Sequence, residues 1–271
     1  MKATKMLVSV LAVCSTVVSL TASAGHHEQK DMAFDHSHRS EKNQQRDMYR
    51  QPFRTLNFFG VEENHKVVEI MPGGGWYTEI LAPMLMEKGQ LIAAHYPADS
   101  EGYRGRSRKG FEEKLAEMPK LYGKTKIVDF VPAQATAEEA KYADVVLTFR
   151  GLHGLQNGGE LNDAFQRFNE MLKTGGKLGV VQHQAPEGHD PVATAKKGYL
   201  PKSYVIEVAQ KAGFKLVAEA YFHNNPKDTI IQDNHKIGVW ALPPSLRDEE
   251  NQEKYKKIGE SNRMTLLFEK M

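Results

Sequence analysis

Cysteine is nearly absent from the 271-residue sequence, which contains only Cys14. That residue lies in a segment with the features of an export signal: two lysines precede an apolar run over residues 6–20, and Ala22-Ser23-Ala24 follows it. We therefore predict a signal peptide over residues 1–24 and an exported chain, periplasmic or secreted. The mature chain then contains no cysteine, which excludes disulfides, thiolate metal sites and a cysteine nucleophile.

Long apolar runs and an excess of one charge are also missing. The run over residues 6–20 is shorter than a membrane-spanning helix, which requires about 20 residues. We therefore expect no stable membrane span once the signal is cleaved. The formal net charge is +2, and removal of Lys2 and Lys5 cancels it. Without clustered lysine and arginine, the sequence indicates no nucleic-acid partner.

Composition divides the rest of the chain into a polar leader, one domain and a charged C-terminal segment. Residues 25–45 include four histidines and predict a flexible leader, whose histidines are either solvated or loosely metal-binding. Residues 46–245 alternate apolar runs with helical patterns and predict one α/β domain. Residues 246–271 begin with dense mixed charge, so we expect an exposed helix or tail there.

Strands and helices alternate through residues 46–245. Apolar runs, most of them rich in valine and isoleucine, predict strands at 66–70, 90–96, 126–131, 144–149, 177–183, 214–220 and 236–241. Helical patterns predict helices at 46–59, 77–87, 107–118, 160–172 and 202–211, and a single helical turn at 136–141. This alternation favours an α/β fold with a doubly wound, mostly parallel sheet of seven strands.

Three consecutive glycines, Gly73 to Gly75, follow the first predicted strand. Glycine permits positive φ and lets the backbone approach a ligand without an intervening Cβ. In a doubly wound sheet, this first strand-to-helix turn faces the crevice where ligands bind. We interpret it as a site for a nucleotide-like cofactor, with a merely tight turn as the alternative. No lysine follows as in a P-loop, and Thr78 stands where the dinucleotide fingerprint has its third glycine.

Several segments together resemble the class I S-adenosylmethionine-dependent methyltransferases, and more closely their exported branch. The resemblance covers residues 46–243. "VVEIMPGGGWYTEILA" is similar to the family's first motif, "ADVVLTFRGLHGL" to its fourth, and "FQRFNEMLKTGGKLGVVQH" to the helix and strand that follow. "QRDMYRQPFRTLNFFGV" and "NNPKDT" are similar to the exported branch. The resemblance implies a Rossmann-like fold and S-adenosylmethionine as cofactor.

Residue by residue, the resemblance implies a cofactor site at the glycine turn. Met71 departs from the first motif, because the family commonly has glycine there, and its side chain is expected to narrow the crevice. At the end of the second strand the family has an acidic residue for the ribose hydroxyls, and this chain has His95 and Tyr96. The residues predicted to bind the cofactor are Glu69, Met71, Pro72, Gly73, Gly74, Gly75, Tyr77, His95 and Tyr96.

A catalytic base is expected at the carboxyl ends of the strands. Methyl transfer from a sulfonium is an in-line displacement, in which the protein positions the nucleophile and removes its proton. His153, in the fourth motif, and His183, at the end of the fifth strand, are the predicted catalytic residues. A structural role for each histidine is the alternative. Arg150 either holds an acidic substrate or pairs with Glu69.

Three functions remain open at this point. The first is an exported methyltransferase that acts on a small molecule. Because S-adenosylmethionine is made in the cytoplasm, two alternatives stand beside it: a ligand-binding module that has lost the activity, or a histidine- or metal-dependent enzyme. For the latter, His183, His189 and Asp190 lie on one loop that His153 could join, but their spacing matches no metal motif and we assign no metal ligand. The sequence indicates neither the acceptor atom nor the oligomeric state.

Overall fold

The computed structural model describes residues 37–229 and 238–271, all within one compact unit of residues 34–271. The predicted signal peptide and residues 25–36 of the predicted leader lie outside the described residues. Within the described part, no helix has the length and apolar character that crossing a membrane requires.

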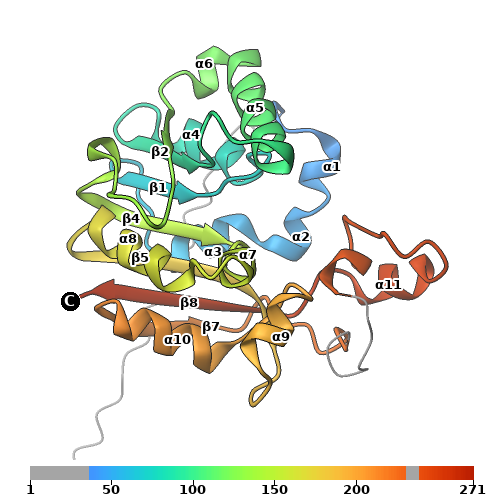
Figure 1. Ribbon diagram of the computed structural model, residues 1–271. Helices are drawn as coiled ribbons and strands as arrows, with labels where there is room; N and C mark the ends of the chain where they lie inside the picture. The colour runs from blue at the N-terminus through green and yellow to red at the C-terminus, as the bar shows by residue number, and fades with distance from the viewer. Residues whose placement is uncertain (1–36, 230–237) are drawn as a thin grey trace, which may run out of the picture. The chain divides into compact units, whose positions relative to one another are not determined.

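A mostly parallel sheet forms the centre of the unit (Figure 1). In spatial order its strands are β3 (Lys126–Asp129), β2 (Gln90–His95), β1 (Lys66–Ile70), β4 (Ala143–Phe149), β5 (Leu172–Ala185), β8 (Arg263–Lys270) and β7 (Phe214–Ala220), and the short β6 (Leu200–Pro201) pairs with β5 beside this path. The strands from β3 to β5 are parallel, whereas β8 runs antiparallel to β5 and β7. The predicted doubly wound α/β fold is confirmed.

Helices connect the parallel strands. They are α4 (Thr78–Leu85), α5 (Gly102–Glu117) and α6 (Pro119–Tyr122) before β3, then η1 (Glu138–Ala140), α7 (Leu152–Asn157), α8 (Leu161–Met171), α9 (Pro191–Ala195) and α10 (Lys202–Lys211). Consecutive residues of β1 and β2 are buried, as expected when helices cover both faces of a sheet. The strand order reverses between β1 and β4, and ligands bind at the carboxyl ends of the strands at such a reversal.

The segment before the sheet differs from the single helix predicted over 46–59. It forms α1 (Glu41–Gln44), α2 (Asp47–Arg50) and α3 (Pro52–Phe58), and the helix breaks at Gln51, whose φ is +40°. The break follows from Pro52, which has no N–H to donate and disfavours helical conformation in the residue before it. As a result α2 and α3 are separate helices.

Gly179 of β5 leaves space for the ring of Phe59, the residue that follows α3. A Cβ added at Gly179 would lie 2.6 Å from the ring of Phe59. We expect Gly179→Ala to lower the free energy of unfolding by about 1–3 kcal/mol, because the overlap must be relieved by moving α3. Urea unfolding followed by circular dichroism measures this change.

The matched control is Gly110→Ala on α5, where an added Cβ meets no atom within 4 Å. That substitution is expected to raise stability by about 0.5–1 kcal/mol, since alanine is the better helix former. Equal stability of the Gly179→Ala variant and the wild type would show that α3 does not depend on this contact.

Two predictions about the C-terminal part are wrong. The strand predicted at 236–241 is not formed where the structure describes it, because Val239–Ala241 is the 3-10 helix η2. The charged segment 246–271 is not only an exposed helix or tail: it contains α11 (Gln252–Ile258) and then β8, which is inserted between β5 and β7. The domain therefore extends beyond the predicted boundary at residue 245.

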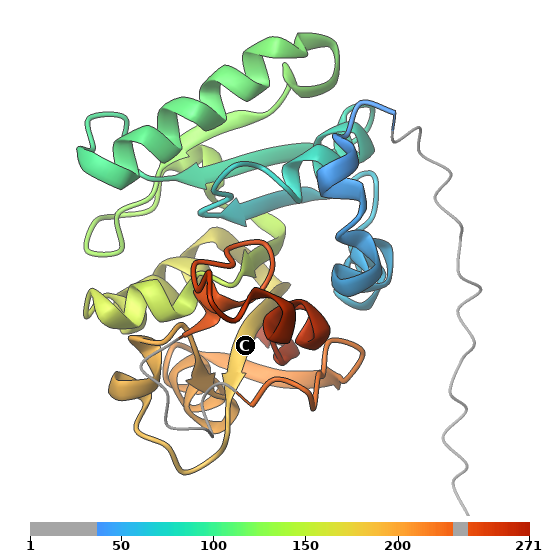
Figure 2. The same cartoon turned by 90° about the vertical axis from the view of Figure 1, so that its right-hand side faces the viewer.

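The N-terminal helices and the segment before β8 lie at one side of the sheet. In Figure 1 the arrows of β1 and β4 point toward the side where α1, α2 and α11 lie, and β8 starts on that side. Figure 2 views the molecule from that side and shows the N-terminal helices (blue) and the segment around α11 (red) there. Segments far apart in the sequence thus surround the carboxyl ends of the parallel strands.

Candidate functional site

The glycine turn after β1 has the backbone conformation that the sequence predicted. Gly73 and Gly75 have φ of +59° and +75°. A Cβ added at Gly73 or Gly74 would have no atom within 4 Å, whereas one added at Gly75 would lie 3.1 Å from Phe111 of α5. The turn is therefore packed against α5 at its last glycine and open beside the first two.

Met71, before the glycine turn, has a left-handed backbone conformation. Its φ is +46°, which is uncommon for a residue with a side chain. Its Cε lies 2.9 Å from the position of a Cβ added at Gly151, at the start of α7. The side chain thus extends toward the end of β4 and does not fill the space beside Gly73 and Gly74.

Glu69 is a buried carboxyl group below the turn. It is 2% exposed, and its Oε2 accepts a 2.6 Å hydrogen bond from Thr78 Oγ1. Burial raises its pKa from 4.5 to about 7, against the opposing effects of Thr78 and Lys114. The structure contains no ion pair between Glu69 and Arg150 in the described residues, so that alternative for Arg150 has no support.

His95 is bound to the glycine turn itself. Its Nε2 lies 3.3 Å from Gly73 O, and its Nδ1 accepts a 2.8 Å hydrogen bond from Tyr96 N. These partners fit a neutral ring that donates from Nε2, and burial lowers the pKa of His95. His95 therefore supports the turn from the end of β2, while the ring of Tyr96 faces Arg104.

Aromatic side chains connect the turn to β4. Tyr77 is buried, and its ring stacks on Phe149 with a centroid distance of 3.6 Å and an angle of 6°. Two guanidinium groups lie over the Trp76 ring, with Arg39 Cζ at 4.9 Å and Arg50 Cζ at 4.4 Å from its centroid. One face of the Tyr77 ring is thus occupied by protein.

The two predicted catalytic histidines lie next to each other. The rings of His153 on α7 and His183 on β5 have centroids 5.8 Å apart. His183 Nδ1 is 2.5 Å from Ser261 Oγ, and His153 Nδ1 is 3.4 Å from Gln182 Nε2. Burial lowers the pKa of His153 to about 4 and that of His183 well below its ordinary value. Both rings are therefore uncharged at neutral pH.

Four arginines and one glutamate gather beside these histidines, and we call them the arginine cluster: Arg46, Arg50, Arg150, Glu260 and Arg263. Glu260 Oε1 lies 2.5 Å from Arg46 Nη2 and 3.4 Å from Arg50 Nε, and its Oε2 lies 2.9 Å from Arg263 Nη1. Arg150 directly follows β4 with a φ of +59°. A left-handed conformation in a large residue is a form of strain that often marks functional sites.

The "NNPKDT" segment holds the loop that carries Glu260. Asn225 Nδ2 donates to Ile258 O at 2.8 Å and to Glu260 O at 2.7 Å. Asp228 accepts from Asn262 N at 2.8 Å and from the hydroxyl of Tyr199. These bonds fix the loop that places Glu260 against the arginines and Ser261 against His183.

Of the arginine cluster, only Arg150 was a candidate site residue from the sequence. Arg46 and Arg50 lie in "QRDMYRQPFRTLNFFGV", and the "NNPKDT" segment binds the loop of Glu260, their carboxylate partner. The similarity of these two segments to the exported branch was the one sequence feature that pointed to the cluster. Glu260 and Arg263 were assigned to a tail, and no pattern around them predicted a site.

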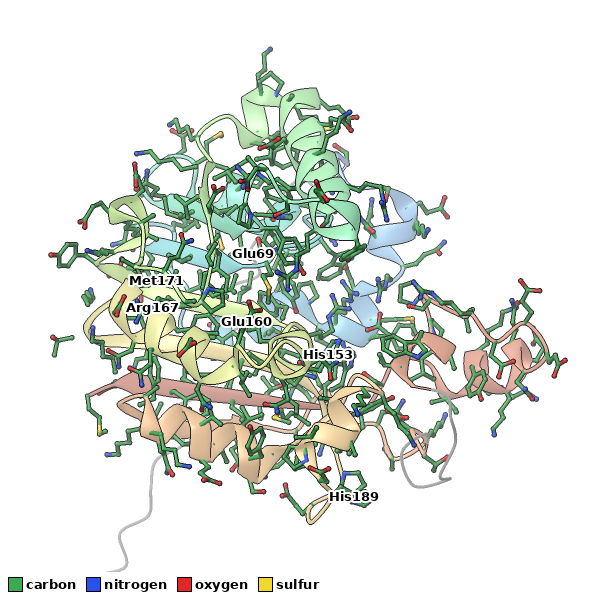
Figure 3. The ribbon with its side chains drawn as sticks, viewed as in Figure 1. Glu69, His153, Glu160, Arg167, Met171 and His189 are labelled. Atoms are coloured by element: carbon green, nitrogen blue, oxygen red, sulfur yellow. The ribbon has the colours of Figure 1, made fainter. Side chains whose placement is uncertain are left out.

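In the part of the chain that the structure describes, His189 and Asp190 do not join His153 and His183. In Figure 3, His189 lies on a loop away from His153. Asp190, its neighbour, caps α9 by accepting from Val192 N at 3.0 Å. Across residues 37–229 and 238–271, no group of three histidine, cysteine or acidic residues is arranged to hold a metal ion.

Comparison with known proteins gives one curated relative to report. No family model matches the chain. The ubiquinone/menaquinone biosynthesis C-methyltransferase UbiE of Pasteurella multocida is 27% identical over 187 residues, which cover 66% of this chain and 63% of the relative. The chain thus spans less than two thirds of that relative's length.

Solved structures share the fold at low sequence identity. A SAM-dependent methyltransferase from Aquifex aeolicus is 14% identical with a TM-score of 0.55, over 88% of this chain and all of that one. The O-methyltransferase NcsB1 of neocarzinostatin biosynthesis, solved with S-adenosyl-L-homocysteine and 1,4-dihydroxy-2-naphthoic acid, is 12% identical with a TM-score of 0.51, over 84% of this chain and 56% of that one. The chain therefore has the Rossmann-like α/β fold of the class I S-adenosylmethionine-dependent methyltransferases.

Proposed function

We propose that the protein is an S-adenosylmethionine-dependent methyltransferase that acts on a small-molecule acceptor after export. The observation that carries the proposal is the open backbone at Gly73 and Gly74, at the carboxyl end of β1 in a sheet with the methyltransferase strand order. The similarity to UbiE supports the same activity. Export rests on the features of residues 1–24.

The residues around the turn fit such a cofactor. Two of the predicted cofactor residues lie against or below the glycines: His95 Nε2 is 3.3 Å from Gly73 O, and Glu69 is buried beneath the turn. Backbone at Gly73 and Gly74 can approach a ligand closely, because no Cβ intervenes. When bound, S-adenosylmethionine supplies a methyl group on a sulfonium, which needs a positioned nucleophile on the acceptor.

His153 and His183 are the candidates for removing a proton from the acceptor. Each is an uncharged imidazole, so each has a lone pair that can accept a proton. Ser261 fixes the orientation of the His183 ring through the hydrogen bond at Nδ1. A hydroxyl or amine placed between the turn and these rings would meet both a base and the reacting methyl group.

One alternative is a binding module with this fold and no activity. It is motivated by Met71, which stands in place of a glycine, and by His95, which stands in place of the acidic residue for the ribose. A charge-assisted hydrogen bond contributes about 1.5–3 kcal/mol, so the loss of that acid weakens cofactor binding without excluding it.

Binding of S-adenosylhomocysteine to the mature protein tests the proposal. We expect calorimetry on residues 25–271 to show saturable binding, and Gly73→Ala to weaken it at least about tenfold, because a Cβ would occupy the ligand's path. Gly60→Ala is the matched control. Gly60 has a φ of +67° and no atom within 4 Å of an added Cβ, so both variants carry the same backbone strain.

The two variants separate a local effect from strain. Unchanged affinity in Gly60→Ala and reduced affinity in Gly73→Ala places the ligand at the turn. Equal affinity in both variants would remove the ligand from the turn, and no binding at millimolar ligand would favour the inactive binding module.

A further inference from the structure

The arginine cluster contains more positive charge than its surroundings compensate. Arg50 and Arg263 are 2% and 3% exposed, and Arg150 lies beside them. In the described residues, Glu260 is the one carboxylate within 4 Å of Arg46, Arg50 or Arg263, and Asp228 acts on Arg263 from farther away. Buried arginines in a purely structural role are normally matched by carboxylates or hydrogen-bond acceptors, so this imbalance requires an explanation.

Several guanidinium donors in the cluster have no hydrogen-bond partner. They are Nη1 of Arg50 and Nε of Arg263, and Nε of Arg50 meets Glu260 Oε1 only as an ion pair at 3.4 Å. Arg150 is half-buried, and among the described residues its guanidinium takes part in no hydrogen bond or ion pair. Unpaired buried donors are costly, and an anion that accepts from them would remove that cost.

The titration behaviour agrees with an excess of positive charge. Burial lowers the pKa of Arg50 well below its ordinary value, and Arg150 lowers it further. Burial also lowers the pKa of Arg150 to about 10, and Arg263 and Arg46 contribute in the same direction. By contrast, Arg50, Arg263 and Arg46 lower the pKa of Glu260 to about 2 although burial opposes them.

The cluster also lies next to the site proposed for methyl transfer. Arg150 follows β4, and its neighbour Gly151 faces the thioether of Met71 from the glycine turn. Arg263 is the register partner of His183 across β5 and β8. Arg50 lies on Trp76, the residue after the glycines. An acceptor held by these arginines would reach both the turn and the two histidines.

We propose that the arginine cluster binds an anionic group of the acceptor, a carboxylate or a phosphate, through Arg50, Arg150 and Arg263. Planar guanidinium groups match the geometry of both anions. This inference rests on the proposed methyltransferase function for the identity of the ligand as acceptor, but anion binding is measurable without it. A bound anion would also supply the negative charge that allows an imidazolium to form at His153 or His183.

The test uses Trp76 as the reporter. The chain has two tryptophans, Trp76 and Trp240. In a Trp240→Phe background, the fluorescence of Trp76 should respond to an anion at Arg50, whose Cζ lies 4.4 Å from the ring centroid. We expect sodium acetate or sodium phosphate, titrated separately at constant ionic strength, to give a saturable change. The anion with the lower midpoint identifies the acceptor as a carboxylate or a phosphate.

Substitutions then locate the anion. Arg150→Gln should raise the midpoint about 10- to 150-fold, the effect of losing a charged hydrogen bond. Arg150→Lys, which keeps the charge but not the forked donors, should give a smaller increase. Arg54→Gln is the control: its guanidinium lies 4.5 Å from the Phe222 ring, outside the cluster, and the midpoint should not change.

The outcomes separate this inference from the proposed function. No saturable change with either anion, or an equal shift in Arg54→Gln, overturns the anion site. S-adenosylhomocysteine binding is measured on the same proteins. If S-adenosylhomocysteine binds and the anions do not, only the proposal of an anionic acceptor is wrong. If the anions bind and S-adenosylhomocysteine does not, the methyltransferase proposal is wrong and the anion site remains.

Discussion

Replacing Glu260 with glutamine is expected to lower the free energy of unfolding by about 3–5 kcal/mol, the cost of leaving buried charges without their partner. Glu260 is 5% exposed and lies within 4 Å of Arg46, Arg50 and Arg263. Glutamine has the same shape but no charge, so these arginines would remain buried without a carboxylate. For a domain of this size the melting temperature should fall by roughly 6–20 °C.

The effect has a defined dependence on pH. The folded protein lowers the pKa of Glu260 from 4.5 to about 2. The stabilisation from Glu260 is therefore complete above about pH 4.5 and is lost as the pH falls toward 2. Calorimetry should show the largest difference between wild type and Glu260→Gln near neutral pH and a shrinking difference in acid.

The control for this prediction is Glu253→Gln on α11. Glu253 is exposed and pairs with Lys256 at the surface of the same C-terminal segment. Its substitution should leave the melting temperature unchanged. If Glu260→Gln melts together with this control, the arginines are neutralised in some other way and the account of the cluster is wrong.

Replacing Arg50 with methionine should have the opposite effect on stability. We expect it to raise the free energy of unfolding of the ligand-free protein by about 1–4 kcal/mol, since an apolar side chain of similar length removes a buried, incompletely paired charge. Glu260 keeps Arg46 and Arg263 as partners, so no carboxylate is left unpaired. A residue that destabilises the fold is retained where function requires it.

Chemical unfolding of Arg50→Met beside Arg54→Met measures this prediction. Arg54 lies on the ring of Phe222 and outside the cluster, so its substitution should not stabilise the protein. The double variant Arg50→Met/Glu260→Gln should lose less stability than Glu260→Gln alone, because one fewer guanidinium is left unpaired. Destabilisation by Arg50→Met would show that Arg50 is a structural residue held by Trp76 and Glu260.

Most of the fold could be predicted because it is encoded locally. The parallel strands are short apolar runs separated by helical patterns, and their observed bounds differ from the predicted ones by a few residues in most cases. β8 was missed because it follows a highly charged stretch and has no helix after it. Residues 239–241 are apolar for a different reason: Val239 packs on Gly198, where an added Cβ would lie 2.5 Å from its Cγ1.

The site was predictable only where one segment forms it. The glycine turn needs a backbone conformation that glycine provides, and the sequence contains that signal directly. The arginine cluster is assembled from α2, the end of β4 and the loop before β8, and its ion pairs join residues as far apart as Arg46 and Glu260. No local pattern encodes such an arrangement. The segments "QRDMYRQPFRTLNFFGV" and "NNPKDT" resemble the exported branch, but only the structure shows that both contact Glu260 or its loop.

The position of β8 has a consequence for how the protein folds. β8 pairs on one side with β5 and on the other with β7, so β7 cannot join the sheet before residues 263–270 have inserted. Contacts between segments so distant in sequence form slowly, because a long loop must close first. The loop that carries Glu260 leads directly into this strand. The arginines should therefore acquire their counter-ion in one of the last folding steps, and a chain stalled before that step would hold its nucleus of parallel strands without a finished ligand site.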